Sequence, residues 1–485
     1  MNSIDEEDRI SKEAAELQEE KEEYDNSEEL EEKKRAVNEF NVEDNEANIQ
    51  TFIQSPQALY INYYSQVGKV LPLEKTESRT YDLRNQIECS EFVEYYKNGE
   101  YLSVAIILSV FEFVALSDLS RLSLSLMEHL PANKTAEADT QEPSVQQDAY
   151  ISLRTIMSVI GGETFITEDG RQCIGLGKDS QQVLKNFFEL FPALRCSIIS
   201  WIIQVNSTIQ FRTTFDAYQI IMAFVRIISV DPFDAKRNIF PQLYINPANA
   251  GLLGNIVYRL HENNETKDEA DTIIKQWMRS DSTWLWRPLC LEYSMYTENK
   301  PDSAYETDIV KLLCKKIYAF SRSDISFIAR IMFQSKSFRT MITEVISRGL
   351  ELSRTEGERI YVSFLYIKLV RQSYYKVNRK NIELPLVACD TKGQQKNIAG
   401  VIGMVMSEYN LRKQLYAVLK AYLNEISDYE FSSNIVIHIS AFFYNMTLAG
   451  RRYQADILQF LKGCNNKMSE QIYIRLDEAI AKEEK

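Results

Sequence analysis

The scarcity of glycine constrains the fold of this sequence more than any other feature. Only 16 of the 485 residues are glycine and 11 are proline, and both shares lie below the roughly 7% and 5% of an average protein. Tight turns between strands depend on these residues, so few strands are expected. The stretches between polar breaks are mostly about 11 to 20 residues long, the length of helices that pack in antiparallel pairs. The sequence therefore predicts an all-α protein.

One segment, at about residues 164–176, departs from the helical pattern. In the sequence TFITEDGRQCIGLG, apolar and polar residues alternate on both sides of Asp169–Gly170. Alternation with a period of two is typical of strands, and Asp-Gly supplies the positive φ angles of a two-residue hairpin turn. We therefore expect one small β-hairpin within the helical body.

The negative charge of the chain is concentrated in residues 1–50. This segment contains 19 Asp and Glu against 6 Lys and Arg, a net charge of −13, whereas the whole chain carries −14. A segment this polar cannot bury a core of its own. We expect an acidic tail that is disordered or partly helical.

The few apolar residues of the tail are regularly spaced. Ile10, Leu17 and Tyr24 follow one another at intervals of seven. A coiled coil would also need apolar residues between them, and those positions hold Ala14, Lys21 and Glu28. The tail is therefore either a solvated segment or a helix that docks in the groove of a partner or on the body of the chain.

A polar stretch divides the remaining chain. Residues 131–148 contain two prolines and, apart from Val145, no large apolar residue, which is typical of a linker. We predict a small helical domain at 51–130 and a larger helical domain at 149–485.

The larger domain contains a weak internal repeat. At an offset of 34 residues, Gln242–Leu243 aligns with Gln276–Trp277, and Gly251–Leu252 aligns with Leu285–Trp286. In the stretch FPQLYINPANAGLLGNIVYRL, followed by IIKQWMRSDSTWLWRPLCLEY, apolar helices are paired across short polar turns. This pairing resembles helical repeats of the HEAT and armadillo type, over about residues 180–480.

The resemblance implies a curved array of stacked helices that binds proteins, peptides or nucleic acid and is not usually catalytic. An irregular helical array would give the same pattern of apolar and polar residues.

No local catalytic or metal-binding motif is recognisable. The three histidines are far apart, and the seven cysteines are scattered without a CxxC pair, so neither a zinc site nor a disulfide framework is indicated. The segment GLGKDS at 175–180 lacks the glycine and hydroxyl positions of a phosphate-binding loop. We predict a protein without a cofactor and without enzymatic activity; an active site assembled from distant residues would escape this reasoning.

Composition also bears on location. Residues 1–50 lack the apolar region of a secretory signal, and the most apolar windows, 104–116 and 198–205, are too short to span a membrane. Scattered cysteines in odd number fit a reducing compartment. We expect a cytoplasmic protein that does not contact the membrane.

Trp277, Trp284, Trp286 and Arg287 form the densest cluster of large aromatic residues. Tryptophan beside arginine is common at interface hot spots, although packing between helices would use the same residues. We name these four as candidate protein-binding residues.

A second candidate surface is basic. Residues 371–396 contain six Lys and Arg against Glu383 and Asp390, a net charge of +4. Basic and aromatic side chains together can bind phosphates and stack on bases. The candidate residues for contact with nucleic acid or another anion are Arg371, Tyr374, Tyr375, Lys376, Arg379 and Lys380. An ordinary solvated loop explains the same composition, because the body is nearly neutral.

These features favour a non-enzymatic interaction protein, a scaffold or adaptor or regulatory subunit, that binds a protein partner through a helical-repeat surface. The first alternative is a nucleic-acid-binding component that uses residues 371–396. The second is an enzyme whose active site is not local in sequence.

Overall fold

The computed structural model describes residues 79–483, with gaps at 97–98, 112, 131–152, 167–169, 177–179, 209–213, 300–302, 373–374, 379–380, 384–391, 427–432 and 449–451. The predicted tail at 1–50 and the predicted linker at 131–148 lie outside the described residues. Within the described residues the chain forms 20 α-helices and five short strands. The prediction of an all-α fold is confirmed.

The N-terminal part of the described chain surrounds a small antiparallel sheet with helices. The sheet has the order β1–β3–β2, with β1 at Phe113–Ala115, β2 at Glu163–Ile166 and β3 at Gln172–Gly175. The helices of this part are α3 (Gln86–Tyr95), α4 (Glu100–Phe111), α5 (Leu116–Met127), α6 (Leu153–Ile160), α7 (Ser180–Leu190) and α8 (Pro192–Thr208).

The predicted hairpin at 164–176 is present as β2 and β3, but its turn differs from the expected one. Ile166 pairs with Gln172, so five residues connect the strands. A two-residue turn at Asp169–Gly170 would instead pair Thr167 with Gln172, a register shifted by one residue. Gly170 does have a positive φ of 81°, as expected where glycine is favoured. The alternating pattern located both strands, but a five-residue connection leaves the register open to a shift of one.

The described parts of the two predicted domains, 51–130 and 149–485, share a sheet and a core. Strand β1 precedes residues 131–148, yet it pairs with β3, which follows them. Helix α4 is buried along most of its length and packs against α7 and α9. Among the described residues the buried apolar side chains form a continuous cluster from Tyr81 to Ile480.

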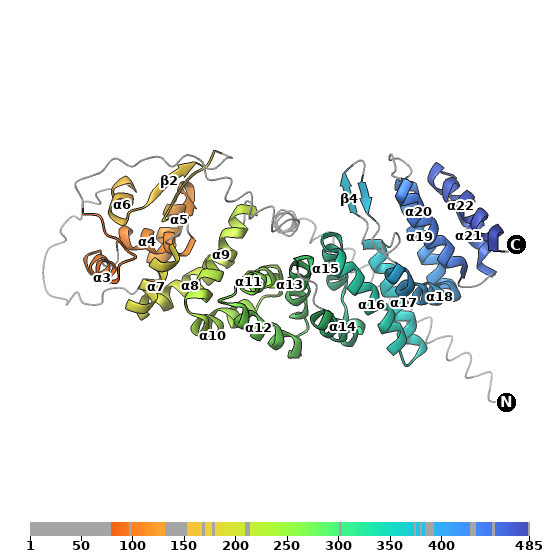
Figure 1. The fold of residues 1–485 in the computed structure, drawn as a ribbon, viewed down its shortest axis with the longest axis horizontal. Helices are drawn as coiled ribbons and strands as arrows, with labels where there is room; N and C mark the ends of the chain where they lie inside the picture. The colour runs from red at the N-terminus through yellow and green to blue at the C-terminus, as the bar shows by residue number, and fades with distance from the viewer. Residues whose placement is uncertain are drawn as a thin grey trace, which may run out of the picture.

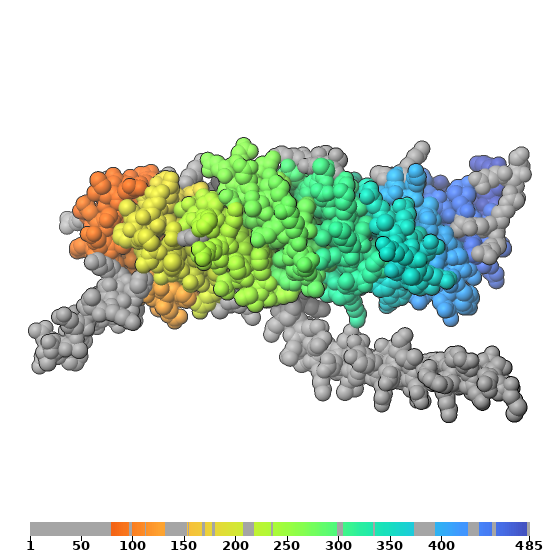
Figure 2. All heavy atoms as spheres, turned by 90° about the horizontal axis from the view of Figure 1, so that it is seen from below, coloured from red at the N-terminus to blue at the C-terminus, as the bar shows by residue number. Residues whose placement is uncertain are grey.

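From α9 onward the chain forms an array of helix pairs (Figure 1). Its first helices are α9 (Thr214–Val230), α10 (Pro232–Leu243), α11 (Ala250–Glu262), α12 (Lys267–Arg279), α13 (Trp286–Asn299), α14 (Ser303–Lys316) and α15 (Arg322–Gln334). They are followed by α16 (Lys336–Leu352), α17 (Glu356–Gln372), α18 (Lys392–Ser407), α19 (Tyr409–Ile426), α20 (Ser433–Leu448), α21 (Arg452–Cys464) and α22 (Lys467–Glu483). Figure 2 shows that these segments follow one another along the long axis of the molecule.

The array has two layers, because its helices form two series in which a helix packs against the one two places further along the chain. The odd-numbered helices from α9 to α21 form one such series and the even-numbered helices from α12 to α22 form the other. Helices of the same series therefore run in the same direction. It follows that all turns from an even-numbered helix to the next odd-numbered helix lie along one edge of the array.

The helical-repeat architecture has a regular step of 36 residues in its first half. Helices α9, α11, α13 and α15 begin at residues 214, 250, 286 and 322. The predicted offset of 34 is two residues short. The offset of 34 aligns Leu252 with Trp286 because both are large apolar residues. These residues hold different positions in their helices, since Trp286 is the first residue of α13 and Leu252 is the third residue of α11.

Close packing between neighbouring helices of one layer depends on Gly254 in α11. A Cβ atom at this position would lie 2.9 Å from the carbonyl oxygen of Pro288 and 3.0 Å from Leu291 in α13. Glycine has a low helix propensity, but at this position the absence of a side chain allows the two helices to approach closely.

A second hairpin was not predicted. Strands β4 (Tyr375–Asn378) and β5 (Asn381–Glu383) pair in antiparallel fashion between α17 and α18. Figure 1 shows this hairpin projecting from the helical array. The alternation of residues in YKVN extends over only four positions, too short a pattern to predict a strand on its own.

Candidate functional site

The turns that lead from an even-numbered helix to the next odd-numbered one form a continuous structure, which we call the turn edge. It consists of residues 244–249, 280–285, 317–321, 353–355, 408 and 449–451, of which the last three lie outside the described residues. Side chains join successive turns. The indole Nε1 of Trp277 donates a hydrogen bond to the hydroxyl of Tyr244 at 2.8 Å, and Lys316 Nζ donates to the carbonyl oxygen of Ser282 at 2.9 Å.

The next turns are linked in the same way. The hydroxyl of Tyr318 lies 3.0 Å from the hydroxyl of Ser353, and the hydroxyl of Tyr361 donates to the carbonyl oxygen of Phe320 at 3.2 Å. Further along, the guanidinium of Arg412 lies 5.1 Å from the ring centre of Tyr453 at the start of α21. Consecutive repeats are thus held in register at the turns, and the turn edge is a well-packed surface.

Trp277 and Trp286, two of the four candidate protein-binding residues, are buried. Trp277 is 1% exposed and Trp286 is 2% exposed. Trp286 packs against Phe320, with ring centres 5.0 Å apart, and its Nε1 donates to the carbonyl oxygen of Thr283. Both indoles therefore belong to the core between repeats, and the candidate surface narrows to Trp284, which is half-buried in the turn, and Arg287.

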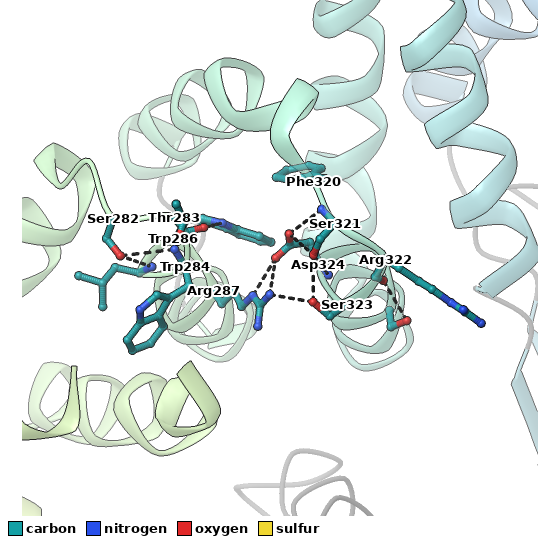
Figure 3. A network of polar contacts seen from close by, with 12 residues as sticks. Ser282, Thr283, Trp284, Trp286, Arg287, Phe320, Ser321, Arg322, Ser323 and Asp324 are labelled. Carbon is teal, nitrogen blue, oxygen red and sulfur yellow. Dashed lines mark hydrogen bonds and ion pairs between the residues drawn. The ribbon is translucent and has the colours of Figure 1, made fainter. Parts of the chain in front are cut away.

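Arg287 joins two neighbouring repeats through a partly buried ion pair (Figure 3). Its Nε donates to Asp324 Oδ1 at 2.8 Å, and its Nη2 donates to Ser323 Oγ at 3.1 Å. Asp324 also accepts a hydrogen bond from the backbone of Ser321 in the capping box that begins α15. The arginine is thus held by an N-cap of the next repeat, and its charge is largely neutralised there.

The turn edge exposes a row of large apolar side chains. Five of the six turns carry one at the turn itself or beside it, with exposed fractions from 39% to 74%: Ile245, Tyr318, Leu352, Tyr409 and Leu448. The remaining turn carries Trp284. Among the described residues of α9 to α22, the other large apolar side chains that are exposed are Phe233, Ile437 and Ile474.

Isolated apolar residues are normal on a protein surface, but a row with one member at each repeat is not. Helices of one layer are spaced by about 8–10 Å, so these side chains recur at roughly this interval along the edge. The row resembles the anchors that proteins use to bind an extended or helical partner segment.

The turns themselves carry no net charge, but the helix ends beside them are basic. The segments that contain its turns, residues 243–250, 278–287, 314–324, 350–359, 406–413 and 446–453, hold 11 Lys and Arg against 6 Asp and Glu, a net charge of +5. Residues 51–485 as a whole have a net charge of only −1. The exposed charges of the edge include Lys315, Arg354 and Lys413. This surface combines apolar and basic side chains.

The basic residues at 371–396 lie elsewhere. Arg371 is exposed at the end of α17, and Tyr375 and Lys376 belong to β4. These positions follow an odd-numbered helix, so they lie on the edge opposite the turn edge. Of the other candidates, Tyr374, Arg379 and Lys380 lie outside the described residues.

A buried polar network between α11 and α14 was missed from the sequence. The Nδ1 of His261 lies 2.7 Å from Glu292 Oε1, and the side chain of Glu292 is fully buried. The hydroxyl of Tyr305 donates to the same carboxylate, and the ring of Tyr296 stacks on the imidazole with centres 4.0 Å apart. Burial, together with the charge of Glu292, raises the pKa of Tyr305 well above its usual value, so this hydroxyl remains a donor.

This network joins α11, α13 and α14. His261 lies in the last turn of α11, and its partner Glu292 is 31 residues away, so no local pattern in the sequence indicates the contact. A histidine and a glutamate about one repeat apart are the only signal that could have indicated the contact. In the described residues, no group of three His, Cys, Asp or Glu side chains is arranged to hold a metal ion.

The cysteines of the described chain are free, and their environments differ. Cys89, Cys290 and Cys314 are buried, whereas Cys196 is exposed. Burial raises the pKa of the Cys89 thiol to about 12 and that of Cys314 to about 11, and it raises the pKa of Cys290 as well. The thiolate is the reactive form, so these three thiols are protonated and unreactive near neutral pH.

We therefore expect iodoacetamide at pH 8 to alkylate Cys196 in the folded protein. Cys89, Cys290 and Cys314 should react at least about 100-fold more slowly, because both access and thiolate fraction are low. Peptide mass spectrometry after timed quenching measures the rates, and urea-unfolded protein provides the control in which all sites react. Rapid alkylation of Cys290 in the folded protein would show that α13 opens readily.

No helix in the described part of the chain is both long and apolar enough to span a membrane. No known protein family, curated protein or solved structure matches the chain. The class of the protein is therefore defined by its fold alone, an array of α-helical repeats with a small β-sheet at one end.

Proposed function

We propose that this chain is a non-enzymatic interaction protein that binds a protein partner along the turn edge. The observation that carries the proposal is the row of exposed apolar side chains, one at each of five turns. A rigid row of this kind suits an adaptor or scaffold, because the interactions between turns hold it in place before a partner binds. A cytoplasmic location is part of the proposal and is supported by the free cysteines of the described chain.

Substitution of the row tests this proposal. The edge variant carries Ile245→Asp, Leu352→Asp and Tyr409→Asp, and the control variant carries Phe233→Asp, Ile437→Asp and Ile474→Asp. All six side chains are exposed, so both variants should keep the melting temperature of the unaltered chain within a few degrees. Each variant makes the same chemical change at three places.

We expect the edge variant to lose a specific partner at least about tenfold, because each apolar anchor at an interface contributes roughly 1 kcal/mol or more. The measurement is quantitative affinity capture from the native host, followed by titration of the purified partner. Equal retention by the edge and control variants would remove the turn edge as the binding surface. Absence of any specific partner, together with turnover of a substrate, would favour an enzyme instead.

Binding of nucleic acid is the second candidate. It is supported by the exposed Arg371 and by the projecting β4–β5 hairpin, whose segment carries a net charge of +4. A gel-shift assay at low salt with Arg371→Glu, Arg379→Glu and Lys380→Glu tests this function separately. Binding that is lost in this variant and retained in the edge variant would assign nucleic acid to the edge opposite the turn edge.

A further inference from the structure

We propose that the acidic segment 1–50 binds in cis to the turn edge of its own chain. This inference rests on the proposed function, in that it takes the turn edge to be a binding surface, and it adds a regulator of that surface. A partner would then have to displace residues 1–50. Three properties of the chain support this occupant: charge, the spacing of apolar residues, and reach.

The charges of the two segments are complementary. Residues 1–50 carry −13, and the six segments of the turn edge carry +5 within a body of residues 51–485 that is otherwise slightly acidic. Attraction between such segments is strong at low ionic strength and is screened over about 10 Å at 0.1 M salt. The helix ends beside the turns are therefore a favourable electrostatic partner for the acidic segment. Residues 371–396 on the opposite edge carry a similar net charge of +4, so the row of apolar side chains is what favours the turn edge.

The apolar residues of the two surfaces have matching intervals. Ile10, Leu17 and Tyr24 are spaced by seven residues, which corresponds to about 10.5 Å along a helix and returns nearly to the same side. The exposed side chains of the turn edge recur with the helix spacing of about 8–10 Å. A helix formed by residues 10–24 on binding would place its three apolar side chains against three consecutive turns.

The absence of a complete heptad pattern in residues 10–28 is consistent with this arrangement. Ala14, Lys21 and Glu28 prevent a symmetric coiled coil. A single apolar position every seven residues is sufficient for docking on a row of single apolar side chains. The spacing therefore fits the edge of this array better than it fits a second copy of the same segment.

The connection to the described body is long enough. Residues 51–78 comprise 28 residues, which span up to roughly 90–100 Å when extended. Seven helix pairs at steps of about 8–10 Å extend over roughly 55–70 Å. The acidic segment can therefore reach the turns without moving the helices.

Carbodiimide cross-linking of the full-length chain tests this contact, because the reagent joins a carboxylate to an amine that touches it. We expect intramolecular links between residues 1–50 and Lys315, Lys316 or Lys413 in the monomer, identified by mass spectrometry. Their yield should fall at least about fivefold when NaCl is raised from 50 to 500 mM. A variant with Ile10→Ser, Leu17→Ser and Tyr24→Ser, which keeps every charge, should lose a similar share.

Matched charge reversals provide the control. The charge-reversed edge variant carries Lys315→Glu, Arg354→Glu and Lys413→Glu, and the charge-reversed control variant carries Lys267→Glu, Lys336→Glu and Lys467→Glu. The last three residues are exposed first residues of α12, α16 and α22, on the opposite edge. Links to Lys316, which both charge-reversed variants retain, should fall at least about fivefold in the charge-reversed edge variant only.

Each other outcome is decisive. Links confined to cross-linked dimers would mean that the segment binds a second copy, and links spread equally over lysines of both edges would mean an unspecific attraction; either overturns the inference. If the segment does not link but the apolar edge variant loses its partner, the proposed function stands and the inference fails. If the segment links but partner binding survives in the apolar edge variant, the proposed function fails.

Discussion

Replacement of Trp277 by alanine is expected to lower the free energy of unfolding by about 3–5 kcal/mol, the range for a large buried aromatic side chain. Trp277 is 1% exposed at the contact of α12 with the preceding turn, so removal of the indole leaves a cavity that a closely packed array cannot easily fill. Urea denaturation followed by circular dichroism measures the loss. Trp284→Ala in the neighbouring turn is the matched control, with an expected loss below about 2 kcal/mol because this indole is only half-buried.

A conservative variant separates packing from hydrogen bonding at the same position. Trp277→Phe keeps an aromatic ring but removes the donor to Tyr244. Burial raises the pKa of the Tyr244 hydroxyl to about 12, so this group stays neutral and needs a partner in the interior. We expect a loss of about 1–2 kcal/mol for this change. A loss from Trp277→Ala no larger than that from Trp284→Ala would contradict the buried position of Trp277.

Replacement of His261 by alanine is expected to cost about 3–5 kcal/mol, as for other buried pairs that lose one member. The carboxylate of Glu292 would remain fully buried with Tyr305 as its remaining partner in the network. His129→Ala is the matched control. The Nδ1 of His129 lies 2.9 Å from the carbonyl oxygen of Ser125 at a helix end, and its loss should cost less than about 1 kcal/mol.

The double variant His261→Leu with Glu292→Leu tests whether these residues act together. Removal of both polar groups avoids a buried unpaired carboxylate, so the double variant should be more stable than His261→Leu alone. Destabilisation equal to the sum of the losses from His261→Leu and from Glu292→Leu would show that the residues contribute independently.

The helical class was predictable because it rests on features that are local in sequence. Glycine scarcity and the lengths between polar breaks reflect the short connections of a two-layer array. The hairpin at 164–176 was recognised for the same reason, since the alternation in both strands is a local pattern. The register of this hairpin could not be predicted, because the connection from Ile166 to Gln172 is longer than a tight turn.

Burial within the tryptophan cluster could not be predicted, because burial of a side chain in a turn depends on which neighbouring residue packs against it. Trp284 and Trp286 are two residues apart, yet one is half-buried and the other contacts Phe320 in the core. Sequence composition alone does not distinguish them. The exposed row could have been noticed at Ile245 and Tyr318, which are large apolar residues within or beside polar breaks between helices.

The network of His261 and Glu292 could not be derived from local patterns at all. Its members come from α11, α13 and α14 and meet only when successive repeats stack. A correct repeat length was needed to bring these positions together, and the predicted offset of 34 differs from the observed step of 36.

One connection of the array is far longer than the others. The connections on the turn edge contain one to six residues, as do the others on the opposite edge, whereas 19 residues separate α17 from α18. The loss of entropy on closing a loop grows slowly with its length, so a further insertion in an already long connection has little thermodynamic effect. The connection between α17 and α18 is therefore the natural place to attach a fluorescent label, an affinity tag or a whole domain without disturbing the spacing of the repeats.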